Sequence, residues 1–148
     1  MGHNALYYLN FMNDYSTGAE SNGVLLMRWL KTNLLEIIRK ERNDKKLVRL
    51  YGVGDYWHAF EESAYQLSQL FEIHYVTILT HQDFPFPVVM TSISDDELRI
   101  YGNNHIFYLK DSGYRELVGT DFLTGQYREW HRKQITDNGI PSIILTIG

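Results

Sequence analysis

The sequence predicts a single α+β domain, in which about three helices pack on one face of a mixed or antiparallel sheet. The length of 148 residues suits one domain with a sizeable core. Helical and extended patterns alternate in the first half of the chain, whereas short extended segments follow one another after residue 87. No linker, repeat or low-complexity stretch divides residues 1–148, so the whole chain is expected to form this domain.

Residues 24–43 carry the clearest helical pattern of the first half. Apolar side chains recur along it at helical spacing, at Leu26, Met27, Leu30, Leu34, Ile37 and Ile38. A second helix is predicted over residues 56–71. Extended segments are expected at residues 5–12, 47–51 and 74–80, and a loop with two prolines at 82–87.

The second half predicts a four-strand antiparallel meander. Its β-branched and aromatic runs are Val88–Ser94, Leu98–Gly102, His105–Lys110 and Tyr114–Val118, separated by aspartate-, asparagine- and glycine-rich turns. A third helix is expected between a Thr120 cap and a stop at Asn138-Gly139, with a final strand at residues 142–147.

Composition excludes several classes of function. The net charge of -4 and the lack of a clustered basic patch argue against nucleic-acid binding. The absence of cysteine excludes disulfides and thiolate metal ligands. No run approaches the roughly 18 apolar residues of a membrane span, and the N-terminal residues do not resemble a signal peptide. We therefore expect a soluble cytosolic protein, and no motif predicts a cofactor or a metal.

The turn Gly52-Val53-Gly54-Asp55 admits two interpretations. Glycines before a helix allow backbone amides to approach a phosphate, which would make Gly52, Gly54 and Asp55 ligand-binding residues. A dinucleotide fingerprint, however, needs a third glycine where Trp57 stands, and Asp55 would repel a phosphate. The favoured interpretation is a tight turn in which Asp55 caps the following helix.

The segment from Arg49 to Gly54 also fits the pattern R-x-x-G-x-G and so is similar to the pyrophosphate-binding segment of acyl-CoA acetyltransferases. That resemblance would imply a transferase-like use of the glycine turn. In that family several antiparallel strands precede the pattern, whereas only one or two candidate strands precede it here. The resemblance therefore supports an alternative hypothesis only.

Two groups of polar residues are candidates for acid-base catalysis. His58, Glu61 and Glu62 follow the glycine turn, and His58 and Glu62 would share a face of the predicted helix, opposite its apolar stripe. His81 and Asp83 lie in the proline-containing loop. A solvated helix face and an ordinary polar loop are the favoured interpretations, and His131 is expected on an exposed basic face of the third helix.

Leu25 and Trp29 lie four positions apart on the first helix and are predicted opposite its core stripe, as an interface or under a neighbouring element. With the aromatic share of 14%, they favour a small binding or interaction protein without catalytic chemistry, which pairs with itself as a homodimer or with another protein. The alternative is a small-molecule-binding domain or small enzyme. It predicts that the glycine turn, His58 and the His81/Asp83 loop converge on one pocket.

Overall fold

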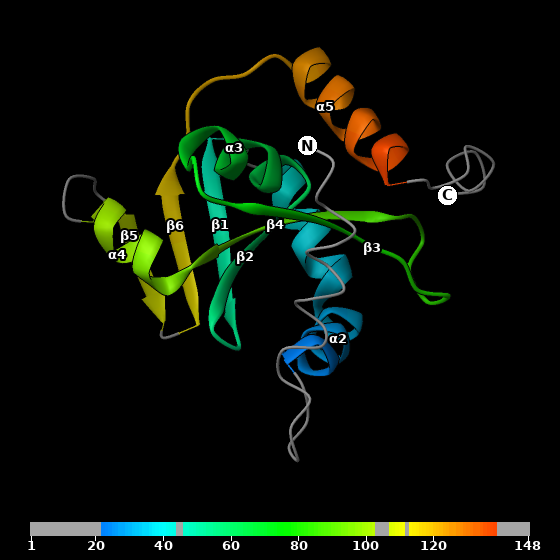
Figure 1. Ribbon diagram of the computed structural model, residues 1–148, viewed down its shortest axis with the longest axis horizontal. Helices are drawn as coiled ribbons and strands as arrows, with labels where there is room; N and C mark the ends of the chain where they lie inside the picture. Colours follow the sequence, from blue (N-terminus) through cyan, green and yellow to red (C-terminus); the bar gives the residue numbers. More distant parts are fainter. Residues whose placement is uncertain (1–21, 44–45, 103–106, 112, 139–148) are drawn as a thin grey trace.

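The computed structural model describes residues 22–43, 46–102, 107–111 and 113–138 (Figure 1). The elements in chain order are α2 (Asn22–Asn43), β1 (Leu47–Val53), β2 (Tyr56–Phe60), α3 (Glu62–Leu70), β3 (Tyr75–Leu79), β4 (Val88–Ser94), α4 (Asp95–Gly102), β5 (Phe107–Asp111), β6 (Tyr114–Val118) and α5 (Thr124–Asp137). They form a single α+β domain. The strands expected at residues 5–12 and 142–147 lie outside the described residues.

The strands form one antiparallel sheet in the order β3-β4-β2-β1-β6-β5. β1 and β2 make a hairpin in which Val53 pairs with Tyr56, so Gly54 and Asp55 form a two-residue turn. Gly54 has a φ of 69°, which the first residue of such a turn requires and which glycine adopts without strain. The glycine turn therefore joins two strands, and Asp55 does not cap a helix.

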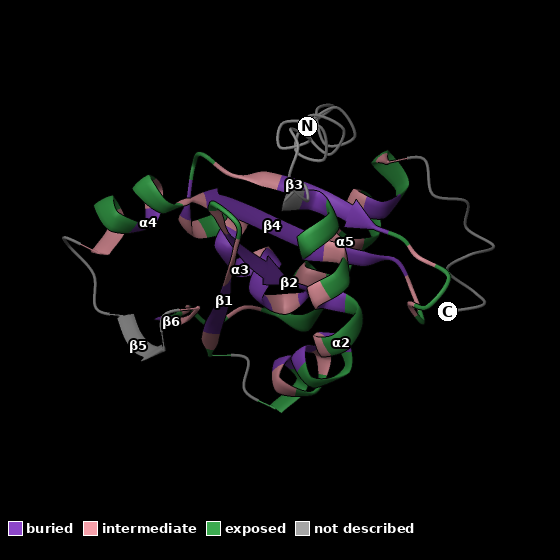
Figure 2. Ribbon diagram, turned by 90° about the horizontal axis from the view of Figure 1, so that it is seen from below, coloured by how far each residue is buried: buried purple, intermediate pink, exposed green. Residues whose placement is uncertain are grey.

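Helices cover both faces of the sheet, which corrects the expectation of a single covered face. The strand residues alternate between two apolar clusters, as the pleat of a sheet requires. Tyr51, Phe60 and Met90 pack against α2, together with Leu26, Leu30, Leu34 and Ile37 of that helix. Val48, Ala59 and Ile93 pack on the other face against α3 and α4. Figure 2 shows β2, β3 and β4 buried along most of their length.

The predicted four-strand meander is wrong. β4 pairs with β2 and β3, and Leu98–Gly102 belongs to α4. The Ser94 hydroxyl accepts a hydrogen bond from the Glu97 backbone N–H at 3.2 Å, so it caps α4, and acidic side chains fill the first helical turn. Of the meander, β5 and β6 alone pair with each other as expected.

The second predicted helix is a strand followed by a helix. Residues 56–60 form β2, which lies between β1 and β4, and α3 starts only at Glu62. The aromatic and apolar residues of this segment suit a strand buried on both faces. Helix α5 also starts later than a Thr120 cap would place it, and Figure 1 shows an extended segment leading to it from β6. Its end at the Asn138 cap agrees with the sequence.

Candidate functional site

Glu61 occupies the junction between β2 and α3 and has an unusual backbone conformation. Its φ of 54° and ψ of -119° are rare for a residue other than glycine and cost on the order of 1–3 kcal/mol. Its backbone N–H donates to the Val89 carbonyl at 3.0 Å, and its own carbonyl accepts from Tyr65 in the first turn of α3. The chain thus turns from strand to helix at a single strained residue.

The Glu61 side chain continues the hydrogen bonding between β2 and β4 where the backbone of β2 ends. The Val89 backbone N–H donates to Glu61 Oε2 at 3.0 Å, so a carboxylate oxygen takes the place of a backbone carbonyl. The remaining contacts of the carboxylate reach α5. His131 Nε2 lies 3.2 Å from both carboxylate oxygens, and the Tyr127 hydroxyl donates to Oε1 at 3.4 Å. One carboxylate therefore connects the sheet with α5.

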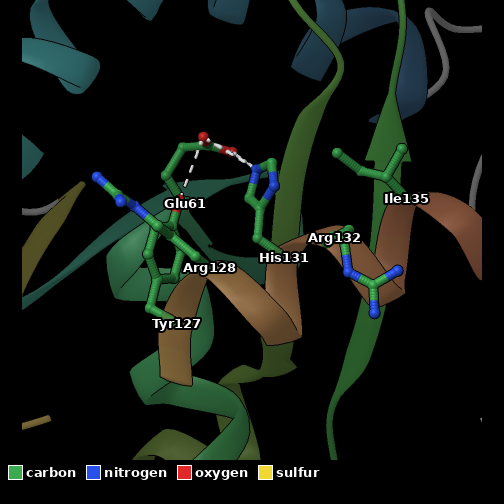
Figure 3. A pocket seen from close by; sticks show the side chains of 6 residues that line it. All are labelled: Glu61, Tyr127, Arg128, His131, Arg132 and Ile135. Atoms are coloured by element: carbon green, nitrogen blue, oxygen red, sulfur yellow. Dashed lines mark hydrogen bonds and ion pairs between the residues drawn. The ribbon is translucent and has the colours of Figure 1, made fainter. Parts of the chain in front are cut away.

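These side chains line a cavity of about 280 Å³ (Figure 3). Its walls are formed by Glu61, Tyr127, Arg128, His131, Arg132 and Ile135. This volume lies just below the roughly 300–1,000 Å³ of typical small-molecule sites. The cavity can therefore hold a small molecule, with carboxylate, imidazole, phenol and guanidinium groups within one site.

Helix α5 is held over Glu61 by few contacts. Ile135 is its buried residue and packs with Ala64, Val76, Ile78 and Val89. The Tyr65 ring of α3 contacts Trp130 at 5.4 Å and Tyr127 at 6.1 Å between ring centroids. Because Tyr127, His131 and Ile135 recur every four residues, they lie on the same face of the helix and turn toward the sheet together.

The phenol of Tyr127 and the imidazole of His131 each take part in the hydrogen bonds of the cavity. Burial, and next the charge of Glu61, raise the pKa of Tyr127, so its phenol stays neutral and donates. With a hydrogen on Nε2, the imidazole of His131 donates to Glu61 and leaves Nδ1 as an acceptor. A carboxylate that orients an imidazole in this way prepares it to accept a proton or a hydrogen bond from a bound molecule.

A second cavity of about 350 Å³ lies beside the glycine turn. It is lined by Gly52, Gly54, Asp55, Tyr56, Trp57 and Asp95, so the three predicted ligand-binding residues share one surface. No helix N-terminus follows the turn, because the chain continues into β2. The glycine turn therefore does not form the phosphate-binding arrangement of a loop followed by a helix N-terminus.

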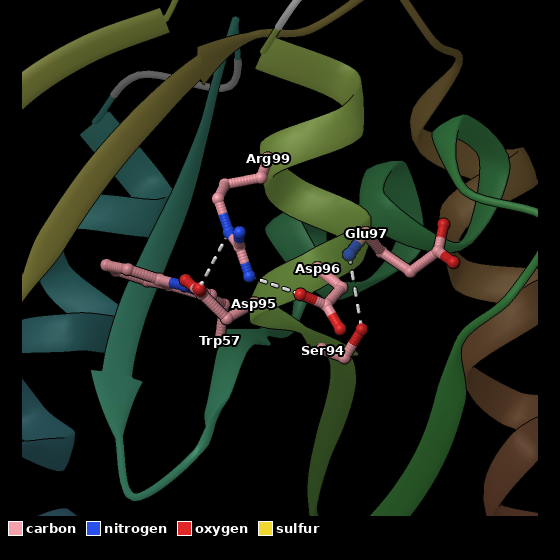
Figure 4. A network of polar contacts seen from close by, with 6 residues as sticks. All are labelled: Trp57, Ser94, Asp95, Asp96, Glu97 and Arg99. Atoms are coloured by element: carbon pink, nitrogen blue, oxygen red, sulfur yellow. Dashed lines mark hydrogen bonds and ion pairs between the residues drawn. The ribbon is translucent and has the colours of Figure 1, made fainter.

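Polar side chains in the wall of this second cavity bond to one another and to neighbouring residues (Figure 4). Trp57 Nε1 donates to Asp95 Oδ1 at 3.0 Å, and Arg99 pairs with Asp95 and Asp96. The bond from Trp57 and the bond and charge of Arg99 hold the pKa of Asp95 below its usual value, against a smaller opposing effect of burial. A Cβ added at Gly52 would lie 3.2 Å from the Trp57 ring, so glycine lets the indole pack on the backbone.

His58 and Glu62 do not form the predicted pair, because only Glu62 belongs to a helix. His58 lies in β2 and is completely buried. Its Nδ1 lies 2.7 Å from Ser92 Oγ and its Nε2 lies 3.2 Å from the Val53 carbonyl oxygen. Burial lowers the pKa of His58 to about 4, against a smaller opposing effect of the hydrogen bond with Val53. The expected solvated position of His58 is wrong.

His81 and Asp83 contact each other in the loop between β3 and β4, where the Asp83 backbone N–H donates to His81 Nδ1 at 3.0 Å. This loop precedes the first residue of β4, whereas the glycine turn lies beside the last one, since Tyr56 pairs with Ser94. The two segments therefore lie at opposite ends of β4. They do not converge on the single pocket that the alternative hypothesis predicts.

Of the predicted interface residues, Trp29 is covered by the sheet. Its ring centroid lies 5.3 Å from that of Tyr51 and 6.2 Å from that of Phe60. Trp29 thus flanks the core stripe of α2 and does not lie opposite it. Leu25 is 37% exposed and remains available at the surface.

Arg49, the first residue of the acetyltransferase-like pattern, is enclosed on the face covered by α2. Its guanidinium lies 3.6 Å from the carboxylate of Glu41, and both side chains are buried. Glu41 also accepts hydrogen bonds from the Ser63 backbone N–H at 2.8 Å and from the Ser63 hydroxyl at 2.7 Å. Arg49 therefore belongs to a buried polar network with Glu41 and Ser63.

In the part of the chain that the structure describes, no three histidine or acidic side chains gather as a metal site. Among the described helices, none is long and apolar enough to cross a membrane. The sequence matches no protein-family model, and comparisons with curated proteins and with solved structures find no significant match.

In the sequence, Glu61 stands between the candidates His58 and Glu62 but is not itself predicted as the central residue of a site. The sequence predicts His131 on an exposed face, whereas the structure places its ring against Glu61, and no pattern in the sequence indicates Tyr127 as a site residue. The available signal was the spacing of Tyr127, His131 and Ile135 on one face of the third predicted helix. That signal shows that the three side chains share a face, but not that the face meets Glu61.

Proposed function

We propose that the protein binds a small molecule in the cavity formed by Glu61, Tyr127, His131 and their neighbours. The observation that carries the proposal is the strained backbone of Glu61 at the cavity wall. Strained residues persist where the surrounding structure holds them, and they cluster at ligand-binding and catalytic sites. Here the strain places one carboxylate against both β4 and His131.

The polar groups of the cavity support binding because they leave part of their hydrogen-bonding capacity for a ligand. Glu61 fixes the imidazole of His131 through Nε2, and Nδ1 can accept a hydrogen bond from a bound group. The ring of Tyr127 and the side chain of Ile135 supply apolar surface beside these polar groups. Such a mixture of apolar wall and a few fixed polar groups is typical of small-molecule sites.

A screen of small fragments by ligand-observed NMR tests the proposal. We expect fragments that bind the wild-type protein to bind His131→Phe at least about tenfold more weakly, since a phenyl ring fills similar space but cannot accept a hydrogen bond. His81→Phe is the matched control, because His81 lies in the β3–β4 loop and does not line the cavity. Unchanged affinity in His131→Phe, or no binding fragment at all, would contradict the proposal.

Self-association is a second candidate function, favoured by exposed apolar side chains on α2. Val24, Leu25 and Leu35 are 46%, 37% and 77% exposed. Light scattering after size exclusion should give a dimer for the wild type and a monomer for Leu35→Asp. This substitution is preferable to one at Trp29, which packs on Tyr51 and would disturb the core. Two monomer traces would remove this candidate.

A further inference from the structure

We infer that the ligand of the Glu61–His131 cavity is a small organic anion, with an apolar body and one carboxylate or phosphate group. This inference rests on the proposed function and names its ligand class. It follows from the cations that line the cavity, from the position of the acidic groups around it, and from the size and chemistry of its wall.

Two guanidinium groups lie at the cavity, because α5 carries Arg128 and Arg132 on either side of His131 (Figure 3). Arg132 is paired with Glu129 at 2.6 Å along the exposed surface of the helix. Among the described residues, no hydrogen bond or ion pair engages Arg128. A guanidinium offers several donors in a planar arrangement that matches a carboxylate or a phosphate. Arg128 is therefore the group that best fits an anion.

The acidic groups determine where the anion can lie. Glu61 already accepts hydrogen bonds from Val89 and contacts Tyr127 and His131, so its carboxylate is occupied by partners within the protein. Burial, and next the charges of Glu61, Glu62 and Glu41, raise the pKa of Tyr127, so acidic groups lie around this phenol. An anion would be repelled there and attracted toward Arg128 and Arg132. The anionic group of the ligand thus lies on the arginine side.

The remaining wall suits the apolar part of the ligand. Ile135 and the ring of Tyr127 line the cavity between the polar groups. A cavity of roughly 150 Å³ is known to accommodate benzene, so about 280 Å³ admits one aromatic ring together with a carboxylate or phosphate group. A ligand of this size can contact Ile135 and Arg128 at the same time.

Isothermal titration calorimetry with four probes of similar size tests this inference. Benzoate and phenyl phosphate are anions, benzamide is a neutral isostere of benzoate, and benzylamine is a cation. We expect one or both anions to bind at least about tenfold more tightly than benzamide, and benzylamine to bind most weakly. Whichever of benzoate and phenyl phosphate binds more tightly identifies the anionic group.

The matched variants are Arg128→Met and Lys133→Met. Both remove a cation from α5 and keep an unbranched side chain, but Lys133 does not line the cavity. We expect Arg128→Met to abolish the tenfold preference for the anion over benzamide, and Lys133→Met to retain it. An unchanged preference in Arg128→Met would overturn the assignment of Arg128.

The outcomes separate this inference from the proposed function. If benzamide or benzylamine binds as tightly as the anions and His131→Phe weakens that binding, the anion class is wrong and the cavity remains a binding site. If no probe and no fragment binds, both proposals are overturned. Anion binding that responds to Lys133→Met as strongly as to Arg128→Met would also overturn the inference, because it would reflect the overall charge of the helix.

Discussion

Two glutamates and two histidines of this chain lie in contrasting surroundings. Glu41 and His58 are enclosed on the face of the sheet that α2 covers, where neighbouring protein groups contact their polar atoms. Glu61 and His131 contact each other at the wall of a cavity. Glutamate and histidine thus occur both in the protein interior and at the wall of a cavity. The difference indicates that the enclosed residues Glu41 and His58 stabilise the fold, whereas Glu61 and His131 can contact a ligand in the cavity.

Glu41, the enclosed glutamate, takes the place of a side-chain cap at the start of α3. Glu61 precedes α3 but makes no capping bond with its side chain, and Glu41 of α2 accepts the Ser63 backbone N–H in the first turn instead. Burial raises the pKa of Glu41 to about 8, although the hydrogen bonds from Ser63 and the charge of Arg49 oppose this rise. This carboxyl group therefore connects the end of α2 with the start of α3. Its removal from water costs free energy, which the hydrogen bonds with Ser63 offset.

The largest effect should follow from breaking this junction. We expect Glu41→Ala to lower the free energy of unfolding by about 4 kcal/mol, because it leaves two buried Ser63 donors, the backbone N–H and the hydroxyl, without an acceptor. Glu36→Ala, which removes an exposed glutamate of the same helix, should leave the free energy of unfolding nearly unchanged.

Urea unfolding at pH 7 measures these costs, and Glu61→Ala gives the corresponding cost for the glutamate at the cavity. Loss of the Glu61 carboxylate leaves the Val89 N–H without its acceptor but also gives water access from the cavity, so we expect a cost of about 1–2 kcal/mol. A larger cost for Glu61→Ala than for Glu41→Ala would reverse the roles assigned to the two regions.

The next effect concerns pH and the enclosed His58. Its pKa in the folded protein is about 4, below the 6.5 of a free imidazole, so the unfolded chain binds the proton more tightly. The neutral histidine therefore contributes stability that is fully present above pH 6.5 and is lost as the pH falls toward 4, up to about 3 kcal/mol. His58→Gln, which does not titrate, should remove this part of the acid dependence.

Urea unfolding at pH 6.5, 5.5 and 4.5 provides the test, since other groups contribute equally to both proteins. The difference in stability between wild type and His58→Gln should shrink as the pH falls. A constant difference between wild type and His58→Gln would mean that His58 is not desolvated as the structure places it.

The smallest effect should come from the hydroxyl of Tyr51. This oxygen is buried and has no hydrogen-bond partner among the described residues. We expect Tyr51→Phe to raise the free energy of unfolding by about 1 kcal/mol, since it removes an unsatisfied polar group and keeps the ring contacts with Trp29 and Phe60. Tyr127→Phe, which removes the donor to Glu61, should instead lower it. Thermal unfolding of both variants decides the sign, and a clearly destabilised Tyr51→Phe would contradict the account.

Local patterns in the sequence were sufficient for much of the fold. The stripe at Leu26, Leu30, Leu34 and Ile37 is the buried face of α2, and the extended segments at residues 88–94 and 114–118 are strands. These segments have a single strong periodicity, and their burial follows from it. The α+β class also follows from the order of such segments.

The errors arose where a local pattern fitted two structures. The spacing of apolar residues predicts a helix over Tyr56–Phe60, but pairing with β1 and β4 makes this segment a central strand, and the local sequence does not show that pairing. For α4, Ser94 followed by Glu97 has the spacing of a helix capping box, and this signal competes with the turn pattern of Asp95-Asp96.

The candidate site could be predicted only in part, because its halves are distant in the chain. Glu61 and His131 are 70 positions apart, and their contact depends on how α5 packs on α3 and the sheet. The strain at Glu61 is also invisible in the sequence, since a glutamate gives no indication of a positive φ. The glycine turn, by contrast, attracted a functional interpretation because of its local pattern alone.

The most direct test of the account is the response of the histidine ring nitrogens to a ligand, observed by ¹H–¹⁵N NMR correlation of the imidazoles. During titration with the tightest-binding fragment, the account predicts that the signals of His131 shift and saturate. Those of the enclosed His58 should remain in place. Saturable binding that leaves His131 unchanged and shifts His58 or His81 would contradict the claim that the Glu61–His131 cavity is the functional site.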